Sequence, residues 1–139
     1  MSFALASFAG KVVAVEQSEA SVISAKANAR KNALGHLSFL CGEATNVLQT
    51  LVEQKEKFDV GVIQTPKSGC SFETYKQLAN LKPKFICVLT SELEQQKKNF
   101  EHLVTNHYSP MFIEPIDSLP GTKSLDYITL FCLKNDSQT

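Results

Sequence analysis

The sequence of 139 residues is 43% hydrophobic and 20% charged, and its fourteen basic side chains balance fourteen acidic ones. This length allows one domain with a substantial core, and the composition excludes a low-complexity or largely disordered chain. Because the net charge is zero, no overall field attracts nucleic acid or an anionic membrane, and binding of RNA requires a local basic patch.

The cysteines indicate a reduced protein without a metal site. They lie far apart, form no CxxC pair and have no histidine at metal-ligand spacing: Cys41, Cys70, Cys87 and Cys132. The start, MSFALASFAG, lacks the apolar core of a signal peptide, and no segment approaches the length of a membrane span. We therefore expect no membrane partner and a cytoplasmic location.

The first half of the chain alternates strand and helix patterns. The apolar, β-branched run 11–16 predicts a strand. Ser18 is a suitable N-cap for the helix that follows, and Gly35 is placed to end that helix. The next predicted elements are a strand over 36–43, an amphipathic helix over 44–57 and a nearly all-apolar strand over 58–65.

The second half continues this alternation and then changes. A helix is predicted over 71–81, a strand over 82–91 and a helix over 92–106, with Leu93, Phe100, Leu103 and Val104 facing inward. Two strand-like runs, 109–120 and 125–135, follow with only a turn near Gly121 between them. The pattern predicts an α/β fold, with a mostly parallel sheet covered on both faces and an antiparallel pair at its C-terminal end.

Four segments carry motifs in a consistent order. They are the run Asn28, Ala29, Arg30 and Asn32, the segment FDVGVIQTPKSG, the segment FICVLTSEL, and the closing residues Asp117, Pro120, Thr122, Leu125 and Asp126. Together they resemble the C-terminal catalytic domain of the RNA 5-methyluridine (uracil-5-) methyltransferases, which modify transfer and ribosomal RNA. The resemblance covers nearly the whole chain and implies a Rossmann-like class I methyltransferase sheet, S-adenosylmethionine as cofactor and RNA as partner.

The chain departs from this family at the catalytic positions. The family's nucleophilic cysteine corresponds to Thr90, whose hydroxyl has no evident base to activate it. The family's closing glutamate base corresponds to Asp126, which has a shorter reach, and the histidine two residues earlier is Ser124. Cys87 lies three residues before Thr90, and packing within the strand is favoured over a displaced nucleophile. Covalent catalysis is expected to be lost.

The resemblance also indicates which residues face the cofactor. Glu16 ends its strand where such folds place an acid on the ribose hydroxyls, and Glu43 ends the next strand near the adenine position. Gln64 stands where the family has the aspartate of an Asp-Pro-Pro-Arg motif, and it is expected to line the same cleft. The alternative is that strand ends are polar only because they reach water. With no Gly-x-Gly loop before Lys11, we expect weak or absent cofactor binding.

We therefore predict that residues 1–139 form a single partial methyltransferase-like domain without the first strand and glycine loop. The leading hypothesis is a catalytically inactive remnant or a binding module. The alternative is a fragment of an S-adenosylmethionine-dependent RNA methyltransferase that is active only with a complementing chain. Because the missing strand would lie inside the sheet, we also predict either a contracted sheet or a homo-oligomer through an exposed sheet edge.

Overall fold

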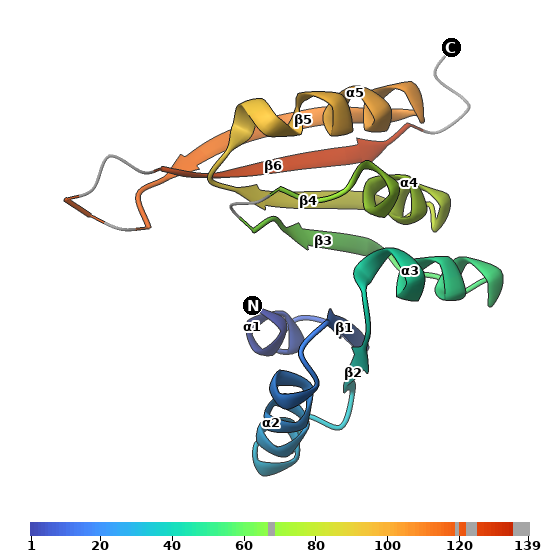
Figure 1. Cartoon of the computed structure of the whole chain (residues 1–139), viewed down its shortest axis with the longest axis vertical. Helices are drawn as coiled ribbons and strands as arrows, with labels where there is room; N and C mark the ends of the chain where they lie inside the picture. The colour runs from blue at the N-terminus through green and yellow to red at the C-terminus, as the bar shows by residue number, and fades with distance from the viewer. Residues whose placement is uncertain (67–68, 119, 122–124, 135–139) are drawn as a thin grey trace. The chain divides into compact units, whose positions relative to one another are not determined.

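The computed structural model describes residues 1–66, 69–118, 120–121 and 125–134. The chain divides into two compact units, Met1–Thr50 and Leu51–Thr139. Along the chain (Figure 1) the elements are α1 (Ser2–Ala6), β1 (Val12–Glu16), α2 (Glu19–Lys31), β2 (Leu37–Cys41), α3 (Ala44–Glu53), β3 (Val60–Gln64), α4 (Phe72–Asn80), β4 (Phe85–Thr90), the 3-10 helix η1 (Leu93–Gln96), α5 (Lys97–Thr105), β5 (Tyr108–Ile116) and β6 (Asp126–Leu133).

The first unit, Met1–Thr50, is built on two parallel strands. β1 and β2 pair in register from Val12 opposite Leu37 to Glu16 opposite Cys41. α1 and α2 pack against these strands. The core that they enclose is small, and its buried members are Ala6, Val22, Ala29, Leu37 and Phe39. Because the strands are parallel, both carboxyl ends lie at the same edge of the pair.

Serine side chains begin two of the helices. The Ser18 hydroxyl accepts a hydrogen bond from the backbone N–H of Ser21 at 3.3 Å, which confirms the predicted N-cap of α2. The Ser71 hydroxyl accepts from the N–H of Thr74 at 3.2 Å at the start of α4. Each cap satisfies one of the N–H groups that the first turn of a helix leaves without an intrahelical partner.

The C-terminal end of α2 differs from the prediction that Gly35 ends this helix. The helix ends at Lys31, and Ala33 adopts the left-handed conformation with φ 55°. The N–H of Leu34 donates back to the carbonyl of Ala29 at 2.9 Å, which closes a Schellman cap. Leu34 is partly buried and packs against the buried cluster of this unit, so the cap is closed by a leucine contact and Gly35 lies beyond it.

The second unit, Leu51–Thr139, contains a four-stranded sheet in the order β3-β4-β6-β5. β3 and β4 are parallel, whereas β6 runs antiparallel to both β4 and β5. α4 and α5 pack against each other, and α5 packs on β5. The fully buried side chains of this unit include Tyr75, Ile86, Val88, Leu103, Tyr108 and Phe131. The predicted α/β fold with a C-terminal antiparallel pair is confirmed.

The predicted contraction of the sheet is not observed among the described strands. β1 pairs only with β2, and β3 is an edge strand that pairs only with β4. Each of these two strands therefore has one edge without a hydrogen-bonded neighbour in the described part of the chain.

The helix predicted over 92–106 forms as η1 followed by α5, with a different buried face. Leu103 is fully buried as predicted, but Val104 is 45% exposed, which contradicts the prediction. Gln96 and Asn99 are buried in its place, at 1% and 6% exposure. The 3-10 turn changes the helical phase, so polar residues occupy positions toward the core.

Candidate functional site

Two carboxylates lie at the carboxyl end of the parallel pair β1–β2. Glu16 is the last residue of β1, opposite Cys41 in the ladder, and Glu43 follows β2 after Gly42. Both glutamates are exposed. The N–H of Gly42 donates to the backbone carbonyl of Glu16 at 3.0 Å, and this bond holds the two strand ends together. This edge of a parallel sheet is where nucleotide-type ligands bind in α/β folds.

The Glu16 side chain is held in place by the start of α2. One of its carboxylate oxygens, Oε1, accepts a hydrogen bond from the N–H of Ser18 at 2.8 Å. Among the described residues, the other oxygen has no hydrogen-bond partner, and the side chain is exposed to solvent. An oriented carboxylate with a free oxygen is suited to accept hydrogen bonds from a pair of ribose hydroxyls.

Gln64, Thr90 and Asp126 come together at one edge of the other sheet. Gln64 ends β3 and Thr90 ends β4, and these strands are parallel neighbours. Asp126 begins β6, one residue before Tyr127, which lies opposite Thr90 in the antiparallel ladder. The roles that the sequence analysis assigned to these three residues stay predictions. Gln64 is exposed, Asp126 is half-buried and Thr90 is buried at 3% exposure.

Thr90 serves the turn after β4. Its hydroxyl oxygen accepts a hydrogen bond from the N–H of Glu92 at 3.1 Å. Within the described residues, no carboxylate or imidazole accepts a hydrogen bond from this hydroxyl. A buried threonine without a base cannot supply the alkoxide that nucleophilic attack requires.

Asp126 is engaged with the end of β5. Its Oδ2 accepts a hydrogen bond from the Ser118 hydroxyl. The neighbouring family positions Lys67, Thr122 and Ser124 lie outside the described residues.

The thiols near this edge are not activated. Burial raises the pKa of the Cys87 thiol above its ordinary 9.0, so the thiolate is disfavoured near neutral pH. Burial also raises the pKa of Cys70, against the opposing effect of hydrogen bonds from Thr74 and the Ser71 backbone. The cysteines are free, and the described residues contain no metal-binding group of His, Cys, Asp and Glu. The predicted packing role of Cys87 agrees with its place inside β4.

A buried polar network next to this edge was missed by the sequence analysis. The Tyr75 hydroxyl donates to Gln96 Oε1 at 2.8 Å, and Asn99 Nδ2 donates to the same oxygen at 3.1 Å. Asn99 Nδ2 also donates to the backbone carbonyl of Cys70 at 3.3 Å, which ties α5 to the segment after β3. The available signal was the spacing of Gln96, Asn99 and Leu103, which is that of one helix face.

Comparison with known proteins gives consistent matches along the chain. A family profile described as a methyltransferase domain matches residues 1–114. Uncharacterised RNA methyltransferases of Geobacter sulfurreducens and Staphylococcus epidermidis are 29% and 30% identical over 130 and 132 residues. These matches cover 94% and 95% of the chain but 26% and 29% of the relatives, so the chain spans less than a third of their length.

Solved structures show the same fold. The Pyrococcus abyssi tRNA (uracil-54, C5)-methyltransferase in complex with S-adenosyl-L-homocysteine has a TM-score of 0.71 at 21% identity, over 91% of this chain and 30% of that one. An rRNA methylase from Streptococcus thermophilus has a TM-score of 0.69 at 11% identity, over 94% and 78% of the two chains. These likenesses confirm the predicted Rossmann-like architecture. In the described ranges, every helix is too short or too polar to cross a bilayer.

Proposed function

Because the chain belongs to the methyltransferase domain family, we propose that it keeps the adenosine-facing half of an S-adenosylmethionine site but not the covalent chemistry of uracil C5 methylation. The proposed substrate class is RNA, in the cytoplasm, which the RNA methyltransferases among its relatives support. The likeness to a tRNA uracil methyltransferase supports uracil as the ancestral target.

The observation that carries the cofactor proposal is the pair of carboxylates at the end of β1–β2. Glu16 is oriented by the Ser18 N–H and presents its second oxygen to solvent, and Glu43 lies at the same strand edge. In this arrangement Glu16 accepts from the ribose hydroxyls and Glu43 accepts from the adenine amine. Gln64 ends β3 in the unit Leu51–Thr139, and the expectation that it also contacts the cofactor stays a prediction from the sequence.

The absence of covalent catalysis is proposed from the state of the candidate nucleophiles. Attack on uracil C6 needs a thiolate or an activated hydroxyl. Thr90 is buried and accepts a backbone hydrogen bond, while burial keeps Cys87 in the thiol form. Asp126, at the position of the family's base, is bound by Ser118. The chain by itself then acts as a cofactor- or RNA-binding module.

The free strand edges favour a second candidate function. In the described residues β1 and β3 each have one edge without a hydrogen-bonded strand. A strand from a complementing segment or chain would satisfy these backbone groups and could bring the cofactor loop that an active methyltransferase needs. A homo-oligomer through either edge would satisfy them without adding chemistry, and light scattering of the purified chain distinguishes these two assemblies by mass.

The test of the cofactor proposal is calorimetric titration with S-adenosylmethionine and S-adenosylhomocysteine. Glu16→Gln keeps an oxygen for the Ser18 N–H but removes the charge, so the fold is preserved while the ribose bonds weaken. We expect the affinity to fall about five- to tenfold, since a charge-assisted hydrogen bond exceeds a neutral one by about 1 kcal/mol. Glu16→Ala should weaken binding further.

Glu19→Ala is the matched control, because Glu19 is exposed at the start of the same helix and is not at the strand edge. It should leave the affinity unchanged. Absence of heat at millimolar ligand, from protein that still unfolds cooperatively, would refute the cofactor proposal. Equal affinity of wild type and Glu16→Gln would show that any bound ligand lies elsewhere.

A further inference from the structure

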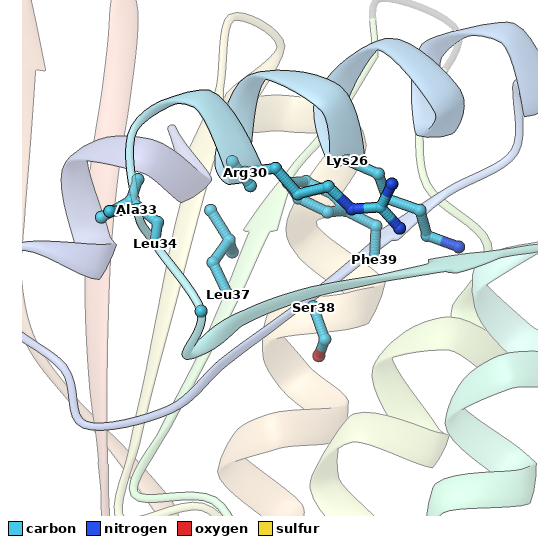
Figure 2. Close-up of a pocket in the computed structure, with 9 residues that line it drawn as sticks. Lys26, Arg30, Ala33, Leu34, Leu37, Ser38 and Phe39 are labelled. Carbon is cyan, nitrogen blue, oxygen red and sulfur yellow. The ribbon is translucent and has the colours of Figure 1, made fainter.

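A cleft in the unit Met1–Thr50 lies between α2 and β2, on the side of β2 shown in Figure 2. Its volume is about 630 Å³, within the range of small-molecule sites. The residues that shape it are Lys26, Ala29, Arg30, Gly35, Leu37 and Phe39. Leu37 and Phe39 lie between helix and strand and form an apolar floor, while Lys26 and Arg30 reach out from the helix above (Figure 2).

The two cations of this cleft are not neutralised by the protein. Lys26 and Arg30 are one helical turn apart on α2, so their side chains share one face. Neither forms an ion pair with any residue that the structure describes. The Schellman cap supplies N–H donors to the helix end, with Leu34 bonding Ala29 and Ala33 bonding the carbonyl of Arg30 at 3.1 Å. Because the carbonyls of Ala29 and Arg30 already accept these hydrogen bonds, they offset less of the positive charge of Lys26 and Arg30 than free carbonyls would.

The cleft is separate from the proposed cofactor residues. It borders the amino end of β2 at Leu37, whereas Glu43 lies beyond the carboxyl end of this strand at Cys41. The four-residue rise along the strand is about 13 Å.

We propose that this cleft binds one nucleotide unit of a single-stranded RNA segment, with the phosphate on Lys26 and Arg30 and the base or sugar on the apolar floor. A guanidinium group binds phosphate oxygens through two parallel hydrogen bonds, and a neighbouring ammonium adds a point charge. Leu37 and Phe39 are only 6% and 8% exposed, so they offer the base or sugar a small apolar contact and the two cations carry most of the binding. The inference rests on RNA as the substrate class of the proposed function and adds an anchoring contact away from the cofactor.

The test is fluorescence anisotropy of a labelled short oligouridine RNA, titrated with the full chain at several salt concentrations. Arg30→Ala should weaken binding about tenfold and lower the salt dependence by about 0.7 for the lost phosphate contact. Lys31→Ala is the control, because Lys31 is the exposed neighbour of Arg30 and does not line the cleft. It removes the same charge and should change the affinity less than twofold.

Gly35 offers a second test that does not disturb the fold. A Cβ at Gly35 would meet nothing within 4 Å, and its φ is not positive. Gly35→Lys should strengthen RNA binding several-fold and Gly35→Glu should weaken it by a similar factor, since each adds a charge at the wall of the cleft. Equal affinities of the two variants, or of Arg30→Ala and wild type, would overturn the proposal.

The source of the nucleotide and the cofactor proposal are tested separately. Uridine monophosphate and inorganic phosphate are used as competitors, and both should displace the RNA only at much higher concentration than unlabelled oligouridine. Displacement by either at equal concentration would assign the cleft to a free small anion and overturn the RNA proposal. Arg30→Ala should bind S-adenosylmethionine like wild type. RNA binding through Arg30 without any cofactor binding would refute the cofactor proposal alone.

Discussion

At the scale of single residues, the polar side chains of the candidate site have structural partners as well as chemical potential. Glu16 accepts from the N–H of Ser18 and keeps a free oxygen for a ligand. The Thr90 hydroxyl, in contrast, is buried and accepts from the N–H of Glu92, with no base among the described residues to take its proton. The same kind of hydrogen bond therefore orients one side chain for binding and leaves the other inert.

Ionisation of the Tyr108 hydroxyl is expected to lower the stability of the protein at high pH. Its hydroxyl is fully buried and donates to the carbonyl of Pro83 at 2.8 Å. Burial, with a smaller effect of Cys132, raises its pKa from 10.0 to about 12. The folded state therefore keeps a proton that the unfolded chain loses above pH 10. This stability is fully present below pH 10 and falls between pH 10 and 12 by up to about 1.4 kcal/mol per pH unit.

Urea unfolding at a series of pH values measures this effect. Tyr108→Phe removes the titrating hydroxyl, so its unfolding free energy should fall less steeply above pH 10 than that of the wild type. The variant should also be less stable near neutral pH, because the Pro83 carbonyl loses its buried donor. Parallel curves for the two proteins above pH 10 would show that Tyr108 ionises normally in the folded state.

At the scale of secondary-structure elements, helix ends are closed by residues that are not glycine. Ala33 follows α2 with φ 55°, and Lys55 follows α3 with φ 56°. In the second case the N–H of Glu56 donates to the carbonyl of Leu51 at 3.1 Å, so both helices end in the same kind of cap. A side chain in the left-handed conformation costs free energy that glycine avoids.

Ala33→Gly should therefore stabilise the protein. We expect the free energy of unfolding to rise by about 1 kcal/mol, because glycine removes the strain at the cap. Ala27→Gly is the matched control: Ala27 is exposed inside α2, where glycine should cost about 1 kcal/mol. Both are measured by urea unfolding. A loss of stability in both variants would argue against the left-handed cap.

The edge strands differ in how readily they could pair with another chain. β5 carries Pro110 and Pro115 and has a register irregularity between Pro110 and Phe112. Proline lacks a backbone N–H and a bulge twists the strand, so both features oppose pairing at an edge. β3 has neither feature over its length. If the chain associates through an exposed sheet edge, as predicted, we therefore expect β3 and not β5 to form the contact.

At the scale of the whole molecule, the two compact units differ in the support that their strands receive. β1 and β2 each have a single hydrogen-bonded neighbour among the described strands, whereas β4 and β6 each have two. Amide hydrogen exchange should therefore be at least about tenfold faster in β1 and β2, since fewer contacts must be lost for local opening. Exchange followed by mass spectrometry measures this difference.

Phe39→Ala tests whether the units open separately. Phe39 is buried in the core of Met1–Thr50, and its truncation typically costs about 3–5 kcal/mol. Exchange should accelerate in β1 and β2 and stay unchanged in β4. Equal acceleration of all strands would instead support the prediction that residues 1–139 behave as one cooperative domain.

The sequence by itself determined the order of the elements and the strands that carry the candidate site residues. Alternation of apolar strands with amphipathic helices predicts a parallel sheet, because continuous hydrophobic strands must be buried on both faces. Polar residues at strand ends then fall at sheet edges, which is where Glu16 lies, whereas the family resemblance and not this pattern pointed to Thr90 and Asp126. These inferences succeed because the periodicity of the chain and the direction of its strands are local properties.

Tertiary packing alone decided the rest. The Schellman cap ends α2 before Gly35 and packs the partly buried Leu34 against the core, and Gly35 then lies at the wall of a cleft. The 3-10 turn places Gln96 inside, where Tyr75 satisfies it, and exposes Val104. Whether a polar side chain is buried depends on partners that are distant in sequence, so no local pattern reveals it.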